Sequence, residues 1–240
     1  MSVITFGGGD PFLYEFLPSL ILRAKERGMT VHVDTNSLAM KQTYETLELL
    51  ENSVDLLGLP LDGADAEMHG SMRDSAVHFD ILMARLDWLK SLRPKTKLNT
   101  IVTGANLTSI ERIADLVVDE IRPARWSVYQ YWPLAEGVNA SGAHAISDGE
   151  FLAATSNLTA RVNGQTTIEV NPLLSRRLTY PFVANDGELY VHSAGPLSSY
   201  DTLGSIFDEN AVGEIFRRCG AERPAAITRY SDSDQPPLNF

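Results

Sequence analysis

Glycines and a carboxylate follow the first apolar run of the sequence, where a small ligand could be bound. Val3–Phe6 leads directly into Gly7-Gly8-Gly9-Asp10-Pro11. Three glycines let the backbone approach a ligand closely and leave amides free, and a carboxylate at that point can hold an ammonium group. The same residues also suit a tight turn in which Asp10 caps a helix and Pro11 is its first residue.

Two more polar clusters follow the next apolar runs. Asp34-Thr35-Asn36-Ser37 could bond hydroxyl groups or a ribose, and it suits an Asx-type turn equally well. The third run ends in Leu59-Pro60-Leu61-Asp62-Gly63, and His69 and Arg73 come soon after it. Arg73 could contact a carboxylate or another anion. A single histidine such as His69, in contrast, is more often structural or solvated than a ligand.

Polar residues at alternate positions mark one face of the fourth and fifth runs. Lys97 and Asn99 are two residues apart and therefore share a face of a strand. A lysine inside a barrel is costly to desolvate unless it meets an anion, whereas at an exposed edge Lys97 would extend into solvent. The fifth run, Arg125–Trp132, carries Arg125, Ser127 and two tyrosines on one face. Aromatic residues in such a strand fill a core more often than they stack on bases.

Alternating strands and helices are expected to position these side chains. Short β-rich runs alternate with amphipathic helical patterns, which indicates βα units and a parallel sheet. Such a sheet, whether a barrel or open, binds ligands at the carboxyl ends of its strands. The predicted strands are Val3–Phe6, Thr30–Asp34, Val54–Leu59, Lys97–Val102, Arg125–Tyr131 and Thr167–Val170.

Three helices are predicted from apolar residues that recur every three or four positions. The first covers Phe12–Arg27, ends at Gly28 and would bury Phe12, Phe16, Leu20 and Ala24. The second, stopped by Pro94, would bury Phe79, Leu82, Met83, Leu86 and Leu89. The third begins at the capping-box pattern Thr108-x-x-Glu111 and would bury Ile110, Ile113, Ala114 and Val117.

The pattern changes after residue 175. Asn185-Asp186-Gly187 separates Tyr180–Val183 from Glu188–His192, which predicts a small hairpin. A last helix is expected at about Glu209–Arg218, followed by an irregular tail. We therefore expect a partial barrel over residues 1–175, with residues 176–240 packed on it as a hairpin, a helix and a tail.

Composition excludes several classes of protein. The chain of 240 residues has 20 basic and 31 acidic residues, and a formal charge of −11 argues against a general nucleic-acid binder. No apolar run is long enough for a membrane span and no signal peptide is recognisable, so the default expectation is a soluble cytoplasmic protein. The single cysteine, Cys219, precedes the helix stop Gly220 and allows neither an internal disulfide nor a cluster held by three thiolates within this chain.

In their order along the chain, these motifs resemble the radical S-adenosylmethionine (SAM) superfamily, and most closely its viperin-like branch, which makes dehydrated nucleotide analogues. The resemblance runs with gaps from Val3 to about Phe216. It is carried by TFGGGDPF at residues 5–12, KLNTIV at residues 97–102 and PARWSVYQ at residues 123–130. It implies a partial (β/α) barrel without its first βα unit, SAM as cofactor, and attack by a 5′-deoxyadenosyl radical on a small, nucleotide-like substrate.

The resemblance also implies a SAM site on the first three loops. Gly8-Gly9-Asp10 would take the place of the superfamily's Gly-Gly-Glu, which holds the amino group of SAM. Thr35-Asn36-Ser37 would match its Thr-Asn-Gly or Ser-Asn-Gly stretch, near the ribose and methionine portions. Arg73 would match the arginine that pairs with the SAM carboxylate, and Asp62 belongs to the same predicted cofactor site.

A substrate site is implied on the fourth and fifth strands. Lys97, Asn99 and Arg125 occupy positions that help to hold a nucleoside triphosphate in the viperin-like branch. A further lysine of that branch falls at Ser127, so one phosphate contact is absent and a triphosphate substrate is in doubt. The sequence assigns no catalytic residue and no metal ligand.

The superfamily's Cys-x3-Cys-x2-Cys loop, which ligates a [4Fe–4S] cluster, would precede Val3 and is not in this chain. One hypothesis, which we favour, is a truncated product of a longer reading frame. The other is a natural cluster-free relative that binds SAM or a nucleotide. Such a relative would be an accessory module whose partner chain completes the sheet edge at Val3–Phe6, or a non-radical SAM-dependent transferase. A barrel fragment without activity is the remaining alternative.

Overall fold

The computed structural model describes residues 3–132, 144–161, 166–176, 181–193 and 199–220. Its contacts divide the chain into two compact units. Unit 1 comprises Met1–Tyr129 and Glu150–Val170, and unit 2 comprises Gln130–Gly149 and Asn171–Phe240. The expected domain division at residue 175 stays a prediction.

A six-stranded sheet in chain order forms the framework of unit 1. The order of its strands is β1-β2-β3-β4-β5-β6, and the pairs from β1 to β4 are parallel. The strands are β1 Val3–Phe6, β2 Thr30–Asp34, β3 Leu56–Pro60, β4 Thr96–Val102, β5 Arg125–Gln130 and β6 Thr167–Asn171. All six predicted strands are thus present, each with bounds within two residues of those expected from the sequence.

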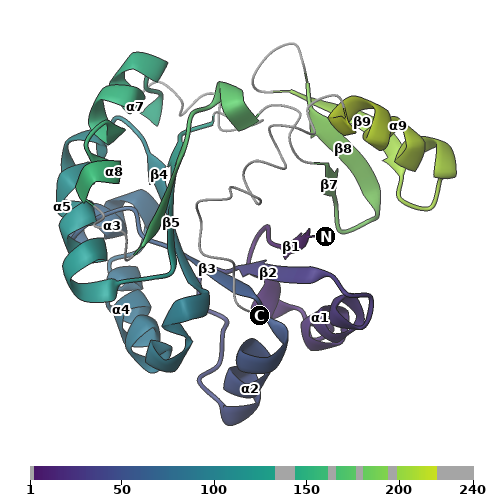
Figure 1. Cartoon of the computed structure of the whole chain (residues 1–240), viewed down its shortest axis with the longest axis horizontal. Coiled ribbons are helices and arrows are strands. Elements are labelled where there is room, and N and C mark those ends of the chain that lie inside the picture. The colour runs from purple at the N-terminus through teal and green to yellow at the C-terminus, as the bar shows by residue number, and fades with distance from the viewer. Residues whose placement is uncertain (1–2, 133–143, 162–165, 177–180, 194–198, 221–240) are drawn as a thin grey trace. The chain divides into compact units, whose positions relative to one another are not determined.

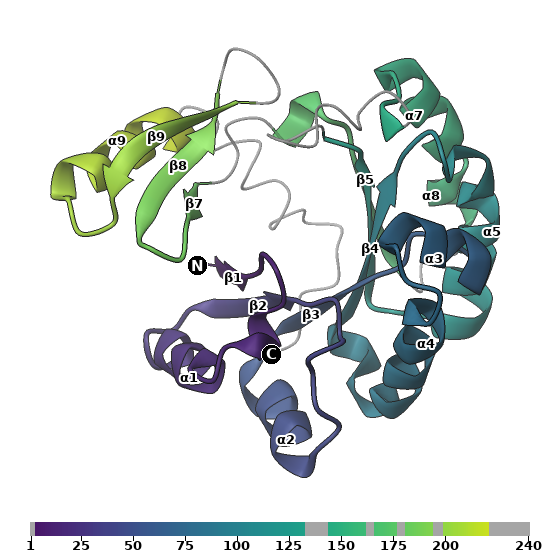
Figure 2. The ribbon, with the colours of Figure 1, turned by 180° about the vertical axis from the view of Figure 1, so that it is seen from behind.

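Strand alternation separates an apolar face of this sheet from a polar one. On β2, Val31 and Val33 are fully buried, while His32 and Asp34 lie on the opposite face. The apolar face continues across the sheet through buried residues of the other strands, namely Leu57, Leu59, Leu98, Trp126 and Val128. Figures 1 and 2 show the helices of unit 1 on one side of the curved sheet, where they cover this apolar face.

The helices of unit 1 follow the strands in turn. They are α1 Leu17–Glu26, α2 Tyr44–Ser53, α3 Ala66–Arg73, α4 His78–Trp88, α5 Ile110–Asp115 and α8 Leu158–Arg161, and α7 Asp148–Thr155 begins in unit 2. Shorter turns are the 3-10 helices η1 Pro11–Leu13, η2 Lys90–Lys95 and η3 Leu107–Ser109, and the π-helical turn η4 Leu116–Ile121. The sequence analysis did not predict α2, α3, α7 or α8.

The first predicted helix is wrong in its start and in its buried face. The chain forms the short turn η1, leaves it through an extended Tyr14, and begins α1 only at Leu17. This break shifts the helical register, so that Leu17, Ile21 and Ala24 are buried. Of the residues expected in the core, Ala24 is buried as predicted, but Phe16 and Leu20 are 66% and 50% exposed.

The other two predicted helices are correct in their buried faces. Leu82, Leu86 and Leu89 are buried on and just beyond α4, which ends at Trp88 before Pro94. The face predicted for the third helix is also buried, at Ile110, Ile113, Ala114 and Val117. Its capping box is wrong, because Thr108 lies inside η3 and α5 starts after Ser109 without a side-chain cap.

Unit 2 contains a small antiparallel sheet and a helix. The strands are β7 Phe182–Val183, β8 Glu188–His192 and β9 Tyr200–Ser205, and they are followed by α9 Glu209–Gly220. The predicted hairpin is confirmed: β7 pairs with β8, and Gly187 in the turn has a positive φ of 87°. Gly220 is the last residue of α9 rather than the residue after it. Tyr180 and the predicted tail lie outside the described residues.

Candidate functional site

Asp10 joins the loop after β1 to the loop after β2. Its Oδ1 accepts hydrogen bonds from the Phe12 amide, at 3.1 Å, and from the Thr35 hydroxyl, at 2.7 Å. Its Oδ2 accepts from the Ala39 amide at 3.3 Å, and the residue is only 3% exposed. The interpretation of Asp10 and Pro11 as a helix cap and first helical residue is confirmed by η1. A role for Asp10 toward the amino group of SAM stays a prediction.

The glycines before Asp10 form an open backbone cradle. Gly8 and Gly9 have positive φ angles of 78° and 46°, and a Cβ atom built on either would meet nothing within 4 Å. Both residues are exposed. A ligand can therefore approach this backbone directly, at the carboxyl end of β1.

The loop after β2 is an Asx-type turn, as one interpretation of the sequence predicted. Asn36 Oδ1 accepts from the Leu38 amide at 2.9 Å, and the Ser37 amide donates to Thr35 Oγ1 at 2.9 Å. Ser37 is fully buried in the left-handed conformation, with a φ of 69°. Its Oγ has no hydrogen-bond partner among the described residues. The left-handed backbone gives a physical reason for the superfamily's glycine at this position.

Asp62 and Arg73 form a buried ion pair after β3. Arg73 Nε donates to Asp62 Oδ2 at 2.7 Å, and the Ile101 amide donates to Asp62 Oδ1 at 2.7 Å. Burial raises the pKa of Asp62, although Arg73 and the Ile101 amide act to lower it. The Arg73 side chain remains 28% exposed. Part of Arg73 is therefore accessible, but in this structure its partner is Asp62 rather than a ligand carboxylate.

Two buried histidines connect this ion pair to the loop after β2. The Asp62 amide donates to His69 Nδ1 at 3.1 Å, His69 Nε2 lies 2.7 Å from His78 Nδ1, and His78 Nε2 lies 2.9 Å from the Asn36 carbonyl oxygen. An amide can only donate, so the proton of neutral His69 is on Nε2 and is shared with His78 Nδ1. His78 then carries its own proton on Nε2 and donates it to Asn36.

The tautomers of this pair are thus set by the backbone at both ends. Protonation of His69 would place a second donor against the Asp62 amide. Burial, together with the nearby His78 and Arg73, lowers the pKa of His69 to about 3. The two rings stack with centroids 4.9 Å apart. The structural interpretation of His69 is confirmed, and the histidine pair holds the Asn36 carbonyl in place.

We call these hydrogen-bonded residues the loop cluster: Asp10, Thr35, Asn36, Ser37, Asp62, His69, Arg73 and His78. They come from the ends of β1, β2 and β3 and from α3 and α4. An unbroken series of contacts runs from Asp10 through the β2 loop and the histidines to Arg73. The sequence-predicted SAM residues on the three loops therefore lie around one region of the structure.

A second set of side chains lies on the non-apolar face of the sheet. Asn99 on β4 donates through Nδ2 to Asp34 Oδ1 on β2 at 3.0 Å, across the intervening strand β3. Gly58 makes this contact possible, because a Cβ atom there would lie 1.7 Å from Asp34 Oδ1 and 2.8 Å from Asn99 Nδ2. Asn99 Oδ1 is buried and has no hydrogen-bond partner among the described residues.

The cations on this face each lie beside a carboxylate. Lys97 Nζ is 3.6 Å from Asp34 Oδ1, and Arg125 forms an ion pair with Glu169 on β6. Burial acts to lower the pKa of Lys97, but Asp34, Tyr129 and Glu169 outweigh it and raise the pKa above its usual value. Lys97 is only 8% exposed, so the alternative of an exposed-edge lysine is wrong.

His32 and Ser127 complete the set. Ser127 Oγ donates to Glu169 Oε2. Burial lowers the pKa of His32 to about 4, and the neighbouring Lys97 and Arg125 act in the same direction. His32 is therefore neutral at neutral pH. We call this set the polar face; its members are His32, Asp34, Lys97, Asn99, Arg125, Ser127 and Glu169.

Sequence reasoning did not select several residues of the two sets. Glu169 was not named, although it lies on the sixth predicted strand. Asp34 was named only within Asp34-Thr35-Asn36-Ser37 and not as a partner of Lys97 or Asn99. His78 lies nine residues after His69 and its contact with Asn36 joins residues 42 apart. No local sequence pattern predicts such a contact.

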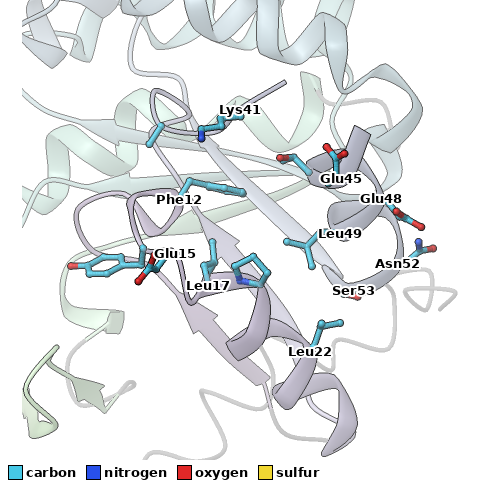
Figure 3. Close-up of a pocket in the computed structure, with 14 residues that line it drawn as sticks. Phe12, Glu15, Leu17, Leu22, Lys41, Glu45, Glu48, Leu49, Asn52 and Ser53 are labelled. Carbon is cyan, nitrogen blue, oxygen red and sulfur yellow. The ribbon is translucent and has the colours of Figure 1, made fainter. Parts of the chain in front are cut away.

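A cavity of about 570 Å³ lies between the α1 and α2 regions, and its lining includes Phe12 and Ala39, whose amides donate to Asp10. Figure 3 shows Leu17 and Leu22 reaching it from α1 and Leu49 from α2. None of the predicted site residues lines this cavity. Among the described residues, no three His, Cys, Asp or Glu side chains gather as a metal site, and no helix is long and apolar enough to cross a membrane.

The family model of the radical SAM superfamily matches residues 1–117 of the chain. The resemblance to this superfamily is therefore confirmed. An S-adenosylmethionine-dependent nucleotide dehydratase of Lacinutrix mariniflava is 28% identical over 160 residues, which are 62% of this chain and 31% of that protein. Another, of Flammeovirga pacifica, is 30% identical over 156 residues, which are 62% of this chain and 51% of that protein. These are the relatives that the viperin-like motifs predicted, and this chain spans a third to a half of their length.

A solved structure that contains S-adenosylmethionine shows the same fold. Streptococcus suis SuiB bound to S-adenosylmethionine superposes with a TM-score of 0.67 at 14% identity, over 92% of this chain and 56% of that one. At such low identity the likeness concerns the fold alone. Together with the six-stranded sheet, it confirms the predicted partial barrel.

The superfamily implies two bound groups, SAM and a [4Fe–4S] cluster, and the residues present fit only the first of them. They fit SAM: the Gly8-Gly9 backbone is open to a ligand, and Ser37 Oγ is buried without a partner among the described residues. They do not fit a [4Fe–4S] cluster, because the only cysteine of the 240 residues is Cys219. No step through a cluster is derived for these residues.

Proposed function

We propose that this chain binds SAM at the carboxyl ends of β1, β2 and β3, as the barrel of a radical SAM enzyme that acts on a small, nucleotide-like substrate. SAM, when bound, supplies the 5′-deoxyadenosyl group. In this proposal Gly8, Gly9, Asp10, Thr35, Asn36 and Ser37 contact SAM, Arg73 with Asp62 receives its carboxylate, and Lys97, Asn99 and Arg125 orient the substrate.

One observation carries the SAM assignment. The loop cluster joins the ends of three neighbouring strands, and beside it the backbone of Gly8 and Gly9 is open and in the left-handed region. A ligand with an amino group, a carboxylate and hydroxyls needs a carboxylate, a guanidinium and small polar groups around one place. Asp10, Arg73 and the Thr35-Asn36-Ser37 turn supply these groups.

A matched pair of glycine variants tests this assignment. Gly8 and Gly28 both have positive φ angles, 78° and 69°, and a Cβ atom on either meets nothing within 4 Å. Ala at either position therefore strains the backbone equally, by about 1 kcal/mol. Only Gly8 lies in the proposed cradle, because Gly28 follows α1 at the opposite end of the strands.

Isothermal titration calorimetry with SAM gives the readout. We expect Gly8→Ala to weaken SAM binding about tenfold or more, whereas Gly28→Ala binds like the original protein. Thermal unfolding of the two variants should show the same small loss of stability. Equal SAM affinity in both variants, or no SAM binding by the original protein, would contradict the assignment.

A second candidate is a SAM- or nucleotide-binding module that works without an iron–sulfur cluster, either as an accessory subunit or as a non-radical transferase. The observation that favours it is the single cysteine of the chain, Cys219. As an accessory subunit it would offer β1, which pairs with β2 alone among the described strands, to a strand of the partner. Methyl transfer from SAM by iron-free protein would support the transferase, and its absence would remove that form of the proposal.

A further inference from the structure

The orientation of the Asn99 amide defines what the polar face can recognise. A carboxylate at neutral pH only accepts hydrogen bonds, so the NH₂ group of Asn99 must face Asp34, 3.0 Å away. Rotating the amide by half a turn would set two oxygens against each other. Asn99 Oδ1 therefore points away from Asp34, buried and without a partner among the described residues. A buried acceptor of this kind is stabilised by a ligand that brings a donor.

The charges of the polar face already cancel. Lys97 lies beside Asp34, and Arg125 is paired with Glu169, which also accepts a hydrogen bond from Ser127. Two cations thus face two carboxylates. A triphosphate would have to displace Asp34 and Glu169 from their partners and leave two carboxylates beside its own negative charges. Its ionised phosphate groups also offer only acceptors, and so they cannot satisfy Asn99 Oδ1.

Hydroxyl groups match this surface better than phosphate groups do. A hydroxyl can donate to Asn99 Oδ1 or to a carboxylate and can accept from Lys97 or Arg125 at the same time. We propose that the polar face binds the uncharged, donor-bearing part of the substrate, such as the hydroxyls of a nucleoside sugar, and that a nucleoside is preferred to its triphosphate. This inference rests on the proposed function, since it names the substrate class of the same barrel.

Calorimetric titrations of the full chain with a ligand panel test the inference. The panel consists of the four ribonucleosides, their triphosphates and free ribose, each titrated with and without SAM. We expect at least one nucleoside to bind about tenfold or more tightly than its triphosphate, with little dependence on salt. Binding of ribose as tight as that of the nucleoside would assign the contact to the sugar alone.

Two variants sharpen the test. Ser127→Lys adds a cation to the neutral face, and we expect it to strengthen triphosphate binding about tenfold at low salt and so to shift the preference from the nucleoside toward its triphosphate. Asn99→Ala removes the orphan acceptor and should weaken nucleoside binding about tenfold. Circular dichroism checks that both variants are folded. The ligand panel on the original protein stands independently of either variant.

The inference is overturned if the original protein binds a triphosphate more tightly than the nucleoside, or if no nucleoside or ribose binds while SAM does. The separate SAM titration distinguishes this failure from failure of the proposed function. Loss of SAM binding with nucleoside binding intact would overturn the SAM site and leave the polar-face inference standing.

Discussion

The loop cluster and the polar face both place cations beside carboxylates, but they hold them differently. In the loop cluster the polar side chains are tied to backbone groups: the Phe12 and Ala39 amides bind Asp10, the Ile101 amide binds Asp62, and the Asn36 carbonyl binds His78. On the polar face the described contacts join side chains to other side chains, as between Asp34 and Asn99.

The loop cluster is therefore a rigid scaffold, whereas the side chains of the polar face can exchange their partners. A side chain bonded to the backbone cannot leave without exposing a buried amide or carbonyl, which costs about 1–3 kcal/mol. Paired side chains can rotate and take a ligand as a new partner at a smaller cost. The loop cluster is therefore suited to present a fixed outline to SAM, and the polar face to rearrange around a substrate.

The strongest test of the rigidity of the loop cluster is the variant Gly63→Ala. A Cβ atom at Gly63 would lie 2.3 Å from the backbone nitrogen of His69 and 2.8 Å from its Cα. Because this neighbour is the backbone of α3, the helix itself must move, and we expect a loss of about 4 kcal/mol in the free energy of unfolding. Urea denaturation measures it. A loss below about 1 kcal/mol would show that the loop cluster is not rigid.

Acid should destabilise the protein through the buried His32 of the polar face. Its pKa of about 4 in the folded state lies below the ordinary histidine value of 6.5, so the unfolded state binds the proton more readily between these values. The stability from neutral His32 is complete above pH 6.5 and falls as the pH decreases toward 4, by about 3 kcal/mol at pH 4. Urea denaturation at several pH values measures this loss.

The His32→Gln variant serves as the control for this prediction. His69 has an even lower pKa and adds a loss of stability in the same direction, which persists in the variant. The difference in slope between the original protein and His32→Gln isolates His32. Equal slopes between pH 6.5 and 4 would show that the polar face does not keep His32 neutral.

Gly58→Ala probes the polar face and should destabilise the protein less than Gly63→Ala does. The new methyl group would meet the end of Asp34 and Asn99 Nδ2, which are atoms of side chains that can rotate away. We expect a loss of about 1.5 kcal/mol, from the broken contact between Asp34 and Asn99. The same urea experiment applies. A loss as large as that of Gly63→Ala would remove the distinction between the two regions.

Ser37→Gly should have the smallest effect on the free energy of unfolding, and it should stabilise the protein rather than destabilise it. The variant relieves the left-handed backbone at φ 69° and removes a buried hydroxyl that has no partner among the described residues. We expect a gain of about 1 kcal/mol in the absence of ligand. If Ser37 Oγ contacts SAM, the gain should shrink when unfolding is measured with SAM present. A loss of stability without ligand would mean that the loop needs the serine.

The sequence predicts the strands well, because alternation of apolar and polar residues is a local property that the sheet preserves. On β2, for example, the apolar Val31 and Val33 alternate with the polar His32 and Asp34. The first helix was predicted wrongly because Phe12, Phe16 and Leu20 repeat every four residues across a break at Tyr14. The apolar repeat does not reveal that break.

The candidate site was predictable residue by residue but not in its contacts. Glycine, carboxylate and amide residues at strand ends mark where a ligand could sit, and Asp10, Asn36 and Arg73 do lie along one series of contacts. The carboxylate partners of the two polar-face cations, Asp34 beside Lys97 and Glu169 beside Arg125, come from other strands. The pairing of carboxylates with cations depends on strand order and register. Neither can be derived from a local sequence pattern.

The histidine pair also bears on the order in which the molecule is assembled. The Asn36 carbonyl receives its hydrogen bond from a residue 42 positions later, on α4. The turn after β2 therefore cannot reach its final form until β3, α3 and the start of α4 have been synthesised and have docked. The surface proposed for SAM is then among the later parts of unit 1 to mature, and a nascent chain released before His78 would lack it.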